Sequence, residues 1–130
     1  MLVDTTFLID VMKNDASAIR KTKQLSDSSA SILVGTPTVF ELYVGVGLSV
    51  RSNEEREKVL SILRSLPQMP LDSSSATKAG MIYAQRMKDR MRIDAEDAML
   101  AGIAVQNNEP ILTRNKRDFL GIPDLKIETY

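Results

Sequence analysis

The chain has 130 residues and a mass of 14.4 kDa, so we expect residues 1–130 to form a single domain with one hydrophobic core. With 43% hydrophobic and 26% charged residues, it is too apolar to stay disordered. Its 17 basic and 17 acidic side chains cancel, which removes the global positive field that many nucleic-acid-binding proteins use. Any binding of nucleic acid must therefore depend on local patches.

The chain contains no histidine and no cysteine. Histidine-based triads and general bases, zinc sites built on His or Cys, disulfides and thiol nucleophiles are all excluded. No stretch approaches the roughly 20 apolar residues that cross a bilayer, and the first residues lack the basic start of a signal peptide. We therefore expect a cytoplasmic protein that does not enter a membrane and whose chemistry depends on carboxylates, hydroxyls, amides, lysine and arginine.

The first part of the chain alternates strand and helix patterns. Residues 1–4 are an apolar run that ends in a carboxylate, and residues 5–12 predict a helix directly behind it. A polar helical pattern over residues 16–25 follows. Residues 31–35 then predict a second buried strand, because they are rich in β-branched and aliphatic side chains between Ser and Gly.

The middle of the chain is mainly helical. Thr36 is expected to be the N-cap of a helix whose first helical position is Pro37. Residues 52–55 have the pattern of a capping box in front of an amphipathic helix that Pro67 ends. Residues 69–71 predict at best a short strand, since proline removes a ladder donor.

The last part of the chain continues the alternation. Residues 72–74 precede another long helical pattern that continues through Met91, and Asp94 is expected to cap a further helix that ends near Gln106. Residues 110–113 predict a strand, and residues 126–130 an alternating, edge-like last strand. Strands that alternate with helices, without hairpin turns, predict an α/β fold: a three-layer α/β/α sandwich around a mainly parallel sheet.

Acidic residues recur where this fold places strand ends and helix starts. Asp4 ends the first strand, Glu41 lies about one turn into a helix, and Asp97 lies in the first turn of a later one. Asn115 and Asp118 follow the strand that ends at residue 113. In right-handed βαβ units these positions gather at one edge of the sheet. Clustered carboxylates repel one another and need a cation, and oxygen ligands alone favour Mg²⁺ or Mn²⁺.

A divalent cation held by carboxylates can activate water and stabilise charge on a phosphoryl oxygen, as in metal-dependent nucleases and phosphatases. Three of the acidic residues also have a purely structural interpretation. Asp97 can complement the helix macrodipole, Asp118 can belong to a solvated turn, and Glu41 can lie on the wet face of its helix. Asp4, at the end of an apolar strand, has the strongest functional signal.

Four segments resemble the motifs of the PIN domain family, and within it the VapC-type toxins of prokaryotic toxin–antitoxin pairs. The segment VDTTFLID contains Asp4 and Thr6, and TPTVFELYVG contains Glu41. The segment IDAEDAMLAGIA contains Asp97, and LTRNKRDF contains Asn115 and Asp118. Each motif is weak alone. The four together, in this order over nearly the whole chain, are specific. Many relatives carry aspartate where this chain has Asn115, which lowers the charge available to a second metal ion.

The resemblance implies a Mg²⁺- or Mn²⁺-dependent endoribonuclease that cleaves single-stranded or structured RNA with metal-activated water. It also implies a homodimer, which we expect to form through the helices around residues 43–66, and inhibition by a VapB-type antitoxin that occupies the acidic groove. The implied metal ligands are Asp4, Glu41, Asp97 and Asp118. Thr6 and Asn115 are expected to orient these ligands or the attacking water.

Basic residues near the proposed site are expected to hold the RNA backbone. The candidates are Arg114, Lys116 and Arg117 beside the last motif, and Arg86, Lys88, Arg90 and Arg92 near the end of an earlier helix. An ordinary solvated charged face is the alternative interpretation.

Three other functions compete with the ribonuclease. A phosphatase of the haloacid dehalogenase type needs a second aspartate two positions after the first, where this chain has Thr6. A receiver domain needs a lysine after a strand, and we find none. A PIN-like module that binds RNA or protein without cutting remains open, although the presence of Asp4, Glu41 and Asp97 argues against it.

Overall fold

The computed structural model describes residues 1–130, and its centre is one sheet of five short parallel strands. The strand order is β3-β2-β1-β4-β5, with bounds β1 (Leu2–Val3), β2 (Leu33–Gly35), β3 (Gln68–Met69), β4 (Ile111–Leu112) and β5 (Ile127–Glu128). The central strand β1 pairs on both sides, with Val3 opposite Val34 and Leu112. The strand predicted at residues 126–130 lies at an edge of the sheet, as expected.

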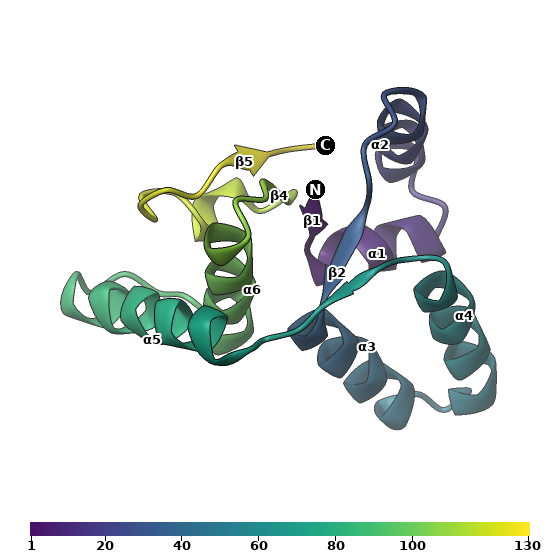
Figure 1. Cartoon of the computed structure of the whole chain (residues 1–130). Coiled ribbons are helices and arrows are strands. Elements are labelled where there is room, and N and C mark those ends of the chain that lie inside the picture. Colours follow the sequence, from purple (N-terminus) through teal and green to yellow (C-terminus); the bar gives the residue numbers. More distant parts are fainter.

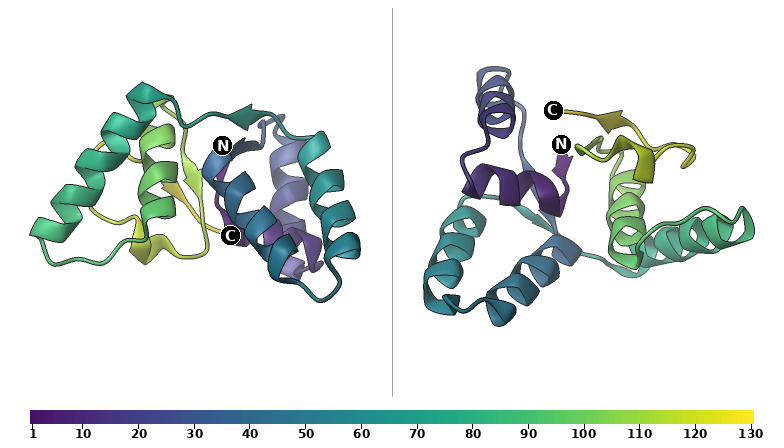
Figure 2. Two further views of the ribbon diagram at one scale, coloured as in Figure 1. Left: turned by 90° about the horizontal axis from the view of Figure 1, so that it is seen from below. Right: turned by 180° about the vertical axis from the view of Figure 1, so that it is seen from behind.

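Six α-helices cover the sheet on both faces (Figure 1). One face carries α1 (Thr5–Met12), α2 (Ala16–Asp27), α3 (Thr36–Leu48) and α4 (Ser52–Arg64), and the other carries α5 (Ser73–Lys88) and α6 (Ala95–Gln106). The two groups lie on opposite sides in both views of Figure 2. The predicted α/β/α sandwich is therefore confirmed. None of the helices has the length and apolar character needed to span a membrane.

The sheet separates two hydrophobic cores, where the chain length had suggested one. Side chains alternate along a strand, so Val3 and Leu2 point to opposite faces. Val3 packs with Leu112 against α1–α4, whereas Leu2 packs with Ile111 against α6. These four side chains are fully buried. A parallel sheet covered on both faces needs such continuous apolar strands.

Close packing of α5 and α6 fixes the helix that carries Asp97. A Cβ atom at Gly102 would lie 2.5 Å from the backbone oxygen of Ser75 and 2.8 Å from the Cβ of Ala79, so a side chain there would push the helices apart. Ala98 and Ala101 are also buried on α6. The small residues of this helix are therefore explained by the short distance to its neighbours.

Two helix starts differ from the predicted caps, and a third has the predicted N-cap residue without its side-chain hydrogen bond. Gly35 rather than Thr36 is the N-cap of α3, and the hydroxyl of Thr36 instead accepts a hydrogen bond from the Leu71 N–H (3.0 Å). Residues 52–55 form no capping box, because Arg51 is the N-cap of α4 and no side chain bonds to the helix end. Asp94 is the N-cap of α6, but its carboxylate makes no capping hydrogen bond.

The ends of β1, β2 and β4 lie side by side because these strands are neighbours in the sheet. Each end leads directly into one of the segments that carry the predicted site residues. Asp4 follows β1 and starts α1, Gly35 ends β2 and starts α3, and Thr113 follows β4. This edge of the sheet holds the cavity described next.

Candidate active site

A polar cavity of about 170 Å³ lies at the carboxyl edge of the sheet. It contains all six residues that the sequence suggested for catalysis, together with four others. The complete set is Asp4, Thr5, Thr6, Glu41, Asp94, Glu96, Asp97, Asn115, Asp118 and Phe119. A second polar hollow of about 370 Å³ shares Asp94, Asp97 and Asp118 with it and adds Arg92 and Ile93. The two form one acidic groove across this edge.

Asp4 is the most deeply buried of these carboxylates, with 4% of its surface exposed. Its Oδ1 accepts a hydrogen bond from the Phe7 N–H (2.8 Å), which caps α1, and its Oδ2 accepts one from the Thr113 hydroxyl (2.6 Å). Burial raises the pKa of Asp4 above its usual value, although both hydrogen bonds favour the charged form. The side chain is thus fixed in place by segments that are far apart in sequence.

Glu41 lies about one and a half turns into α3 and turns inward to the cavity. Its Oε1 accepts a hydrogen bond from the Thr5 hydroxyl (2.7 Å), and the Thr38 hydroxyl lies 3.2 Å from that of Thr5. Burial raises the pKa of Glu41 and outweighs the hydrogen bond from Thr5, and the charge of Glu96 adds to the rise. Glu41 therefore does not lie on the wet face of its helix.

The pKa of Asp97 is raised more than those of Asp4 and Glu41. Burial raises its pKa to about 7, and the negative charges of Glu41 and Asp118 contribute to the rise. A carboxylate that only complemented the dipole of α6 would have a lowered pKa. The electrostatics of Asp97 thus favour membership of a carboxylate cluster over a role in helix stability.

Asn115 and Asp118 reach the cavity from the loop after β4. The Asn115 N–H donates to the Thr113 hydroxyl (2.9 Å), and the Asp118 N–H donates to the Asn115 carbonyl (3.0 Å). The single turn η1 (Lys116–Asp118) then directs Asp118 toward Asp97. The loop and the end of β1 are joined, because the hydroxyl that binds Asn115 also binds Asp4.

The basic residues proposed for RNA binding differ in their surroundings. Lys116, Arg117, Lys88, Arg90 and Arg92 are exposed, and Arg92 lines the larger hollow. Arg86 is buried, with 6% of its surface exposed, and donates to the Leu120 carbonyl (2.6 Å), so RNA cannot reach it. The guanidinium of Arg114 is bound to Asp10 and Asp15 on the side of α1 and α2.

Four polar residues of the site were not identified from the sequence. Thr5, rather than the motif residue Thr6, makes the hydrogen bond to Glu41, and Thr113 holds Asp4. Asp94 and Glu96 add carboxylates to the cavity. The pairing of β1 with β4 places Thr113 next to Asp4, and no local pattern in the sequence could reveal that pairing.

The donor chemistry of the cavity fits a hard divalent cation, because every ligand it offers is a carboxylate, hydroxyl or amide oxygen. Asp4, Glu41, Asp97 and Asp118 are the residues that could hold it. No three acidic residues are placed closely enough to coordinate a metal ion without rearrangement. Both oxygens of Asp4 already accept hydrogen bonds, but each has a second lone pair for a cation. Binding would require the carboxylates that line the cavity to move closer together.

Comparison with known sequences gives one consistent family. The PIN domain model matches residues 1–125. Ribonuclease VapC1 of Methanocaldococcus jannaschii is 30% identical over an alignment that covers 100% of this chain and 86% of that protein. The tRNA(fMet)-specific endonuclease VapC of Salmonella typhimurium is 26% identical over 99% of this chain and 96% of that protein.

Solved structures give the same result for the fold. VapBC2 from Rickettsia felis, bound to a DNA fragment of its promoter, matches 99% of this chain and 97% of its own with a TM-score of 0.90 at 20% identity. DNA-bound VapBC from Salmonella typhimurium matches 98% of this chain and 96% of its own with a TM-score of 0.87 at 26% identity. With the acidic residues of all four motifs gathered in one cavity, this chain belongs to the PIN domain family.

Proposed function

We propose that this chain is a VapC-type endoribonuclease that hydrolyses RNA phosphodiester bonds with water activated by Mg²⁺ or Mn²⁺. The observation that carries the proposal is the convergence of Asp4, Glu41 and Asp97, whose pKa values are all raised at one edge of the sheet. Such a cluster is costly without a cation. The ribonuclease names of the relatives support the same activity. We place it in the cytoplasm, where its RNA substrate occurs.

The chain's own residues have distinct tasks in this mechanism. Asp4, Glu41, Asp97 and Asp118 would hold the cation, which when bound would supply positive charge to the phosphoryl oxygens and lower the pKa of water. Thr113 and Thr5 orient Asp4 and Glu41 through their hydroxyl groups. Asn115 and Thr6 line the cavity and can orient the attacking water. Lys116 and Arg117, exposed beside the cavity, hold the RNA backbone.

We expect the purified chain to cut single-stranded RNA with Mg²⁺ or Mn²⁺ and to lose this activity in excess chelator. Asp4→Asn and Glu41→Gln should each lower the rate by about 100-fold or more, because each removes charge from the proposed metal site. Gel analysis of labelled RNA would measure the rate.

The matched controls are Asp124→Asn and Glu57→Gln, which change exposed carboxylates outside the cavity and should keep full activity. Full activity of the Asp4 variant, or of the wild type in chelator, would contradict the proposal. RNA binding without cleavage would support the non-catalytic module, and release of phosphate from a monoester without RNA cleavage would support the phosphatase.

Stability measurements can separate the two interpretations of Asp97. The folded state keeps this carboxyl neutral up to a pKa of about 7, whereas the unfolded chain ionises it near 3.8. The wild type without metal should therefore lose stability as the pH rises from about 4 to about 7. Asp97→Asn cannot ionise, so it should match the wild type at pH 4 and exceed it at pH 8 by roughly 1 kcal/mol, since the side chain is partly exposed.

Thermal unfolding in chelator at the two pH values measures this difference, with Asp124→Asn as the control. Saturating Mg²⁺ at pH 8 should stabilise the wild type more than the variant. If Asp97 acted only on the helix dipole, the variant would be less stable by roughly 0.3–1 kcal/mol under all these conditions. Equal shifts with Mg²⁺ in both proteins would remove Asp97 from the proposed metal site.

The partner that inhibits this chain is expected to be a VapB-type antitoxin, since similar folds occur in solved VapBC complexes. An acidic cavity attracts side-chain cations as well as metal ions, so we expect an Arg or Lys of the antitoxin to enter it near Asp4 and Asp97. Replacing that residue with Gln should weaken inhibition by about tenfold or more. Unchanged inhibition after replacement of every basic residue in the contacting segment would contradict this prediction, and replacements outside the segment are the control.

A homodimer through the helices around residues 43–66 also remains our prediction, and α3 supplies exposed apolar residues for it. Phe40, Val44 and Leu48 form an apolar stripe at every fourth position of this helix, with 60%, 43% and 82% of their surfaces exposed, and Val50 beyond its end is fully exposed. Such a row is typical of an interface. Sedimentation at tens of micromolar should give a dimer for the wild type and for the control Ile19→Arg on α2, and a monomer for Leu48→Arg. A monomeric wild type would refute the prediction.

A further inference from the structure

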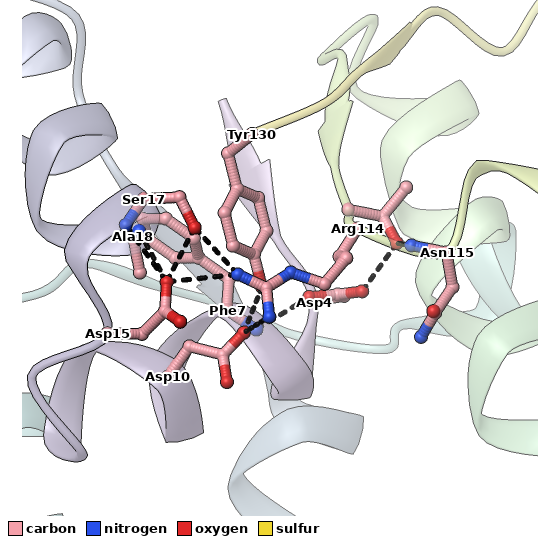
Figure 3. Close-up of polar contacts among 10 residues, drawn as sticks. Asp4, Phe7, Asp10, Asp15, Ser17, Ala18, Arg114, Asn115 and Tyr130 are labelled. Carbon is pink, nitrogen blue, oxygen red and sulfur yellow. Dashed lines mark hydrogen bonds and ion pairs between the residues drawn. The ribbon is translucent and has the colours of Figure 1, made fainter.

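Arg114 lies in the loop after β4, between Thr113 and Asn115, and its side chain turns away from the cavity toward α1 and α2 (Figure 3). Its Nη2 donates to Asp15 Oδ1 (2.9 Å) and to Ser17 Oγ (2.8 Å). Its Nη1 lies 3.3 Å from Asp10 Oδ2. One side chain thus connects the loop to the end of α1 and to the start of α2.

Tyr130 completes this cluster. Its hydroxyl donates to Asp10 Oδ2 (2.7 Å), and the guanidinium carbon of Arg114 lies 4.9 Å from the centre of its ring. The same ring packs on Phe7 in a T-shaped arrangement, with 4.9 Å between the ring centres. The cluster therefore restrains the Arg114 guanidinium through its ion pairs with Asp10 and Asp15 and through its contact with the Tyr130 ring.

The same loop carries residues of the cavity. The Thr113 hydroxyl donates to Asp4, and the Asn115 N–H donates to the Thr113 hydroxyl. Phe7, which packs on Tyr130, donates its backbone N–H to the other oxygen of Asp4. A displacement of Arg114 would thus move Asp4 through two sets of contacts, one through Thr113 and the other through Tyr130 and Phe7.

We propose that Arg114 is a positioning residue, anchored by Asp10 and Asp15, which holds Thr113 and Asn115 in register with Asp4. This inference rests on the proposed ribonuclease function and assigns Arg114 a task other than RNA binding. An RNA phosphate would have to compete with two carboxylates that already bind the guanidinium. One cation against two carboxylates also leaves a net negative charge, which does not attract RNA.

The two roles give opposite results in kinetics. If Arg114 positions the loop, Arg114→Gln should lower kcat by about tenfold or more and leave KM and the salt dependence unchanged. If it binds RNA, the same change should raise KM and should reduce the slope of log affinity against log salt concentration by about one. Arg114→Lys should not restore kcat, because an ammonium cannot reproduce the directed contacts of the guanidinium.

Substitutions of the anchoring carboxylates sharpen the test. Asp10→Asn and Asp15→Asn should each lower kcat if the cluster positions the loop, and combination with Arg114→Gln should lower it little further. Asn can still cap α2 at position 15, so the helix start is preserved. If Arg114 instead binds RNA, removing these negative charges should lower KM.

Hydrogen exchange of backbone amides gives a readout without RNA or metal. Arg114→Gln should speed exchange at Asn115 and Asp118, whose N–H groups donate within the loop, while the exposed control Lys116→Gln should not. Unchanged exchange and unchanged kcat in Arg114→Gln would overturn the positioning role, as would a change in KM alone. A wild type that cuts no RNA would instead refute the proposed function, and the exchange data would still decide whether Arg114 holds the loop.

Discussion

The hydrogen-bonded carboxylate of Asp4 is the point on which both the fold and the cavity depend. One oxygen caps α1 through the Phe7 N–H, and the other binds the Thr113 hydroxyl at the end of β4. These two contacts set the direction of the first helix and the relative position of two central strand ends. They also satisfy a carboxylate that would otherwise be costly to bury. A residue of the proposed metal site is therefore also a structural junction of the sheet.

The pair Asp10 and Asp15 and the carboxylates of the cavity differ in whether a cation neutralises their charge. Asp10 and Asp15 are neutralised in part by Arg114, and Asp10 also accepts a hydrogen bond from Tyr130. The carboxylates of the cavity form no salt bridge, and the pKa of Asp97 rises to about 7. The carboxylates without a salt bridge are those of the cavity, where a divalent cation could contact a phosphate of the RNA. Repulsion between these carboxylates lowers the stability of the folded state, and such a loss of stability is common at functional sites.

Local patterns predicted the elements and the acidic positions well, but they misjudged individual contacts. The motif pointed to Thr6, whereas Thr5 makes the hydrogen bond to Glu41. Arg86 had the same status as its basic neighbours, yet it is buried against the Leu120 carbonyl. Consecutive residues at a helix start differ only in the direction of their side chains, and burial depends on what packs over a helix. Neither property is encoded in a short segment alone.

The sequence by itself determined the order of strands and helices, the restriction to oxygen ligands, and the placement of Asp4 at a strand end and of Glu41 and Asp97 near helix starts. These features depend on composition and on contacts between near neighbours. Only the tertiary structure decided which groups touch. Thr113 reaches Asp4 across 109 positions and Arg114 reaches Asp15 across 99, because the strand order brings β4 beside β1. Such contacts follow from the non-local pairing of strands, which no segment of the chain specifies on its own.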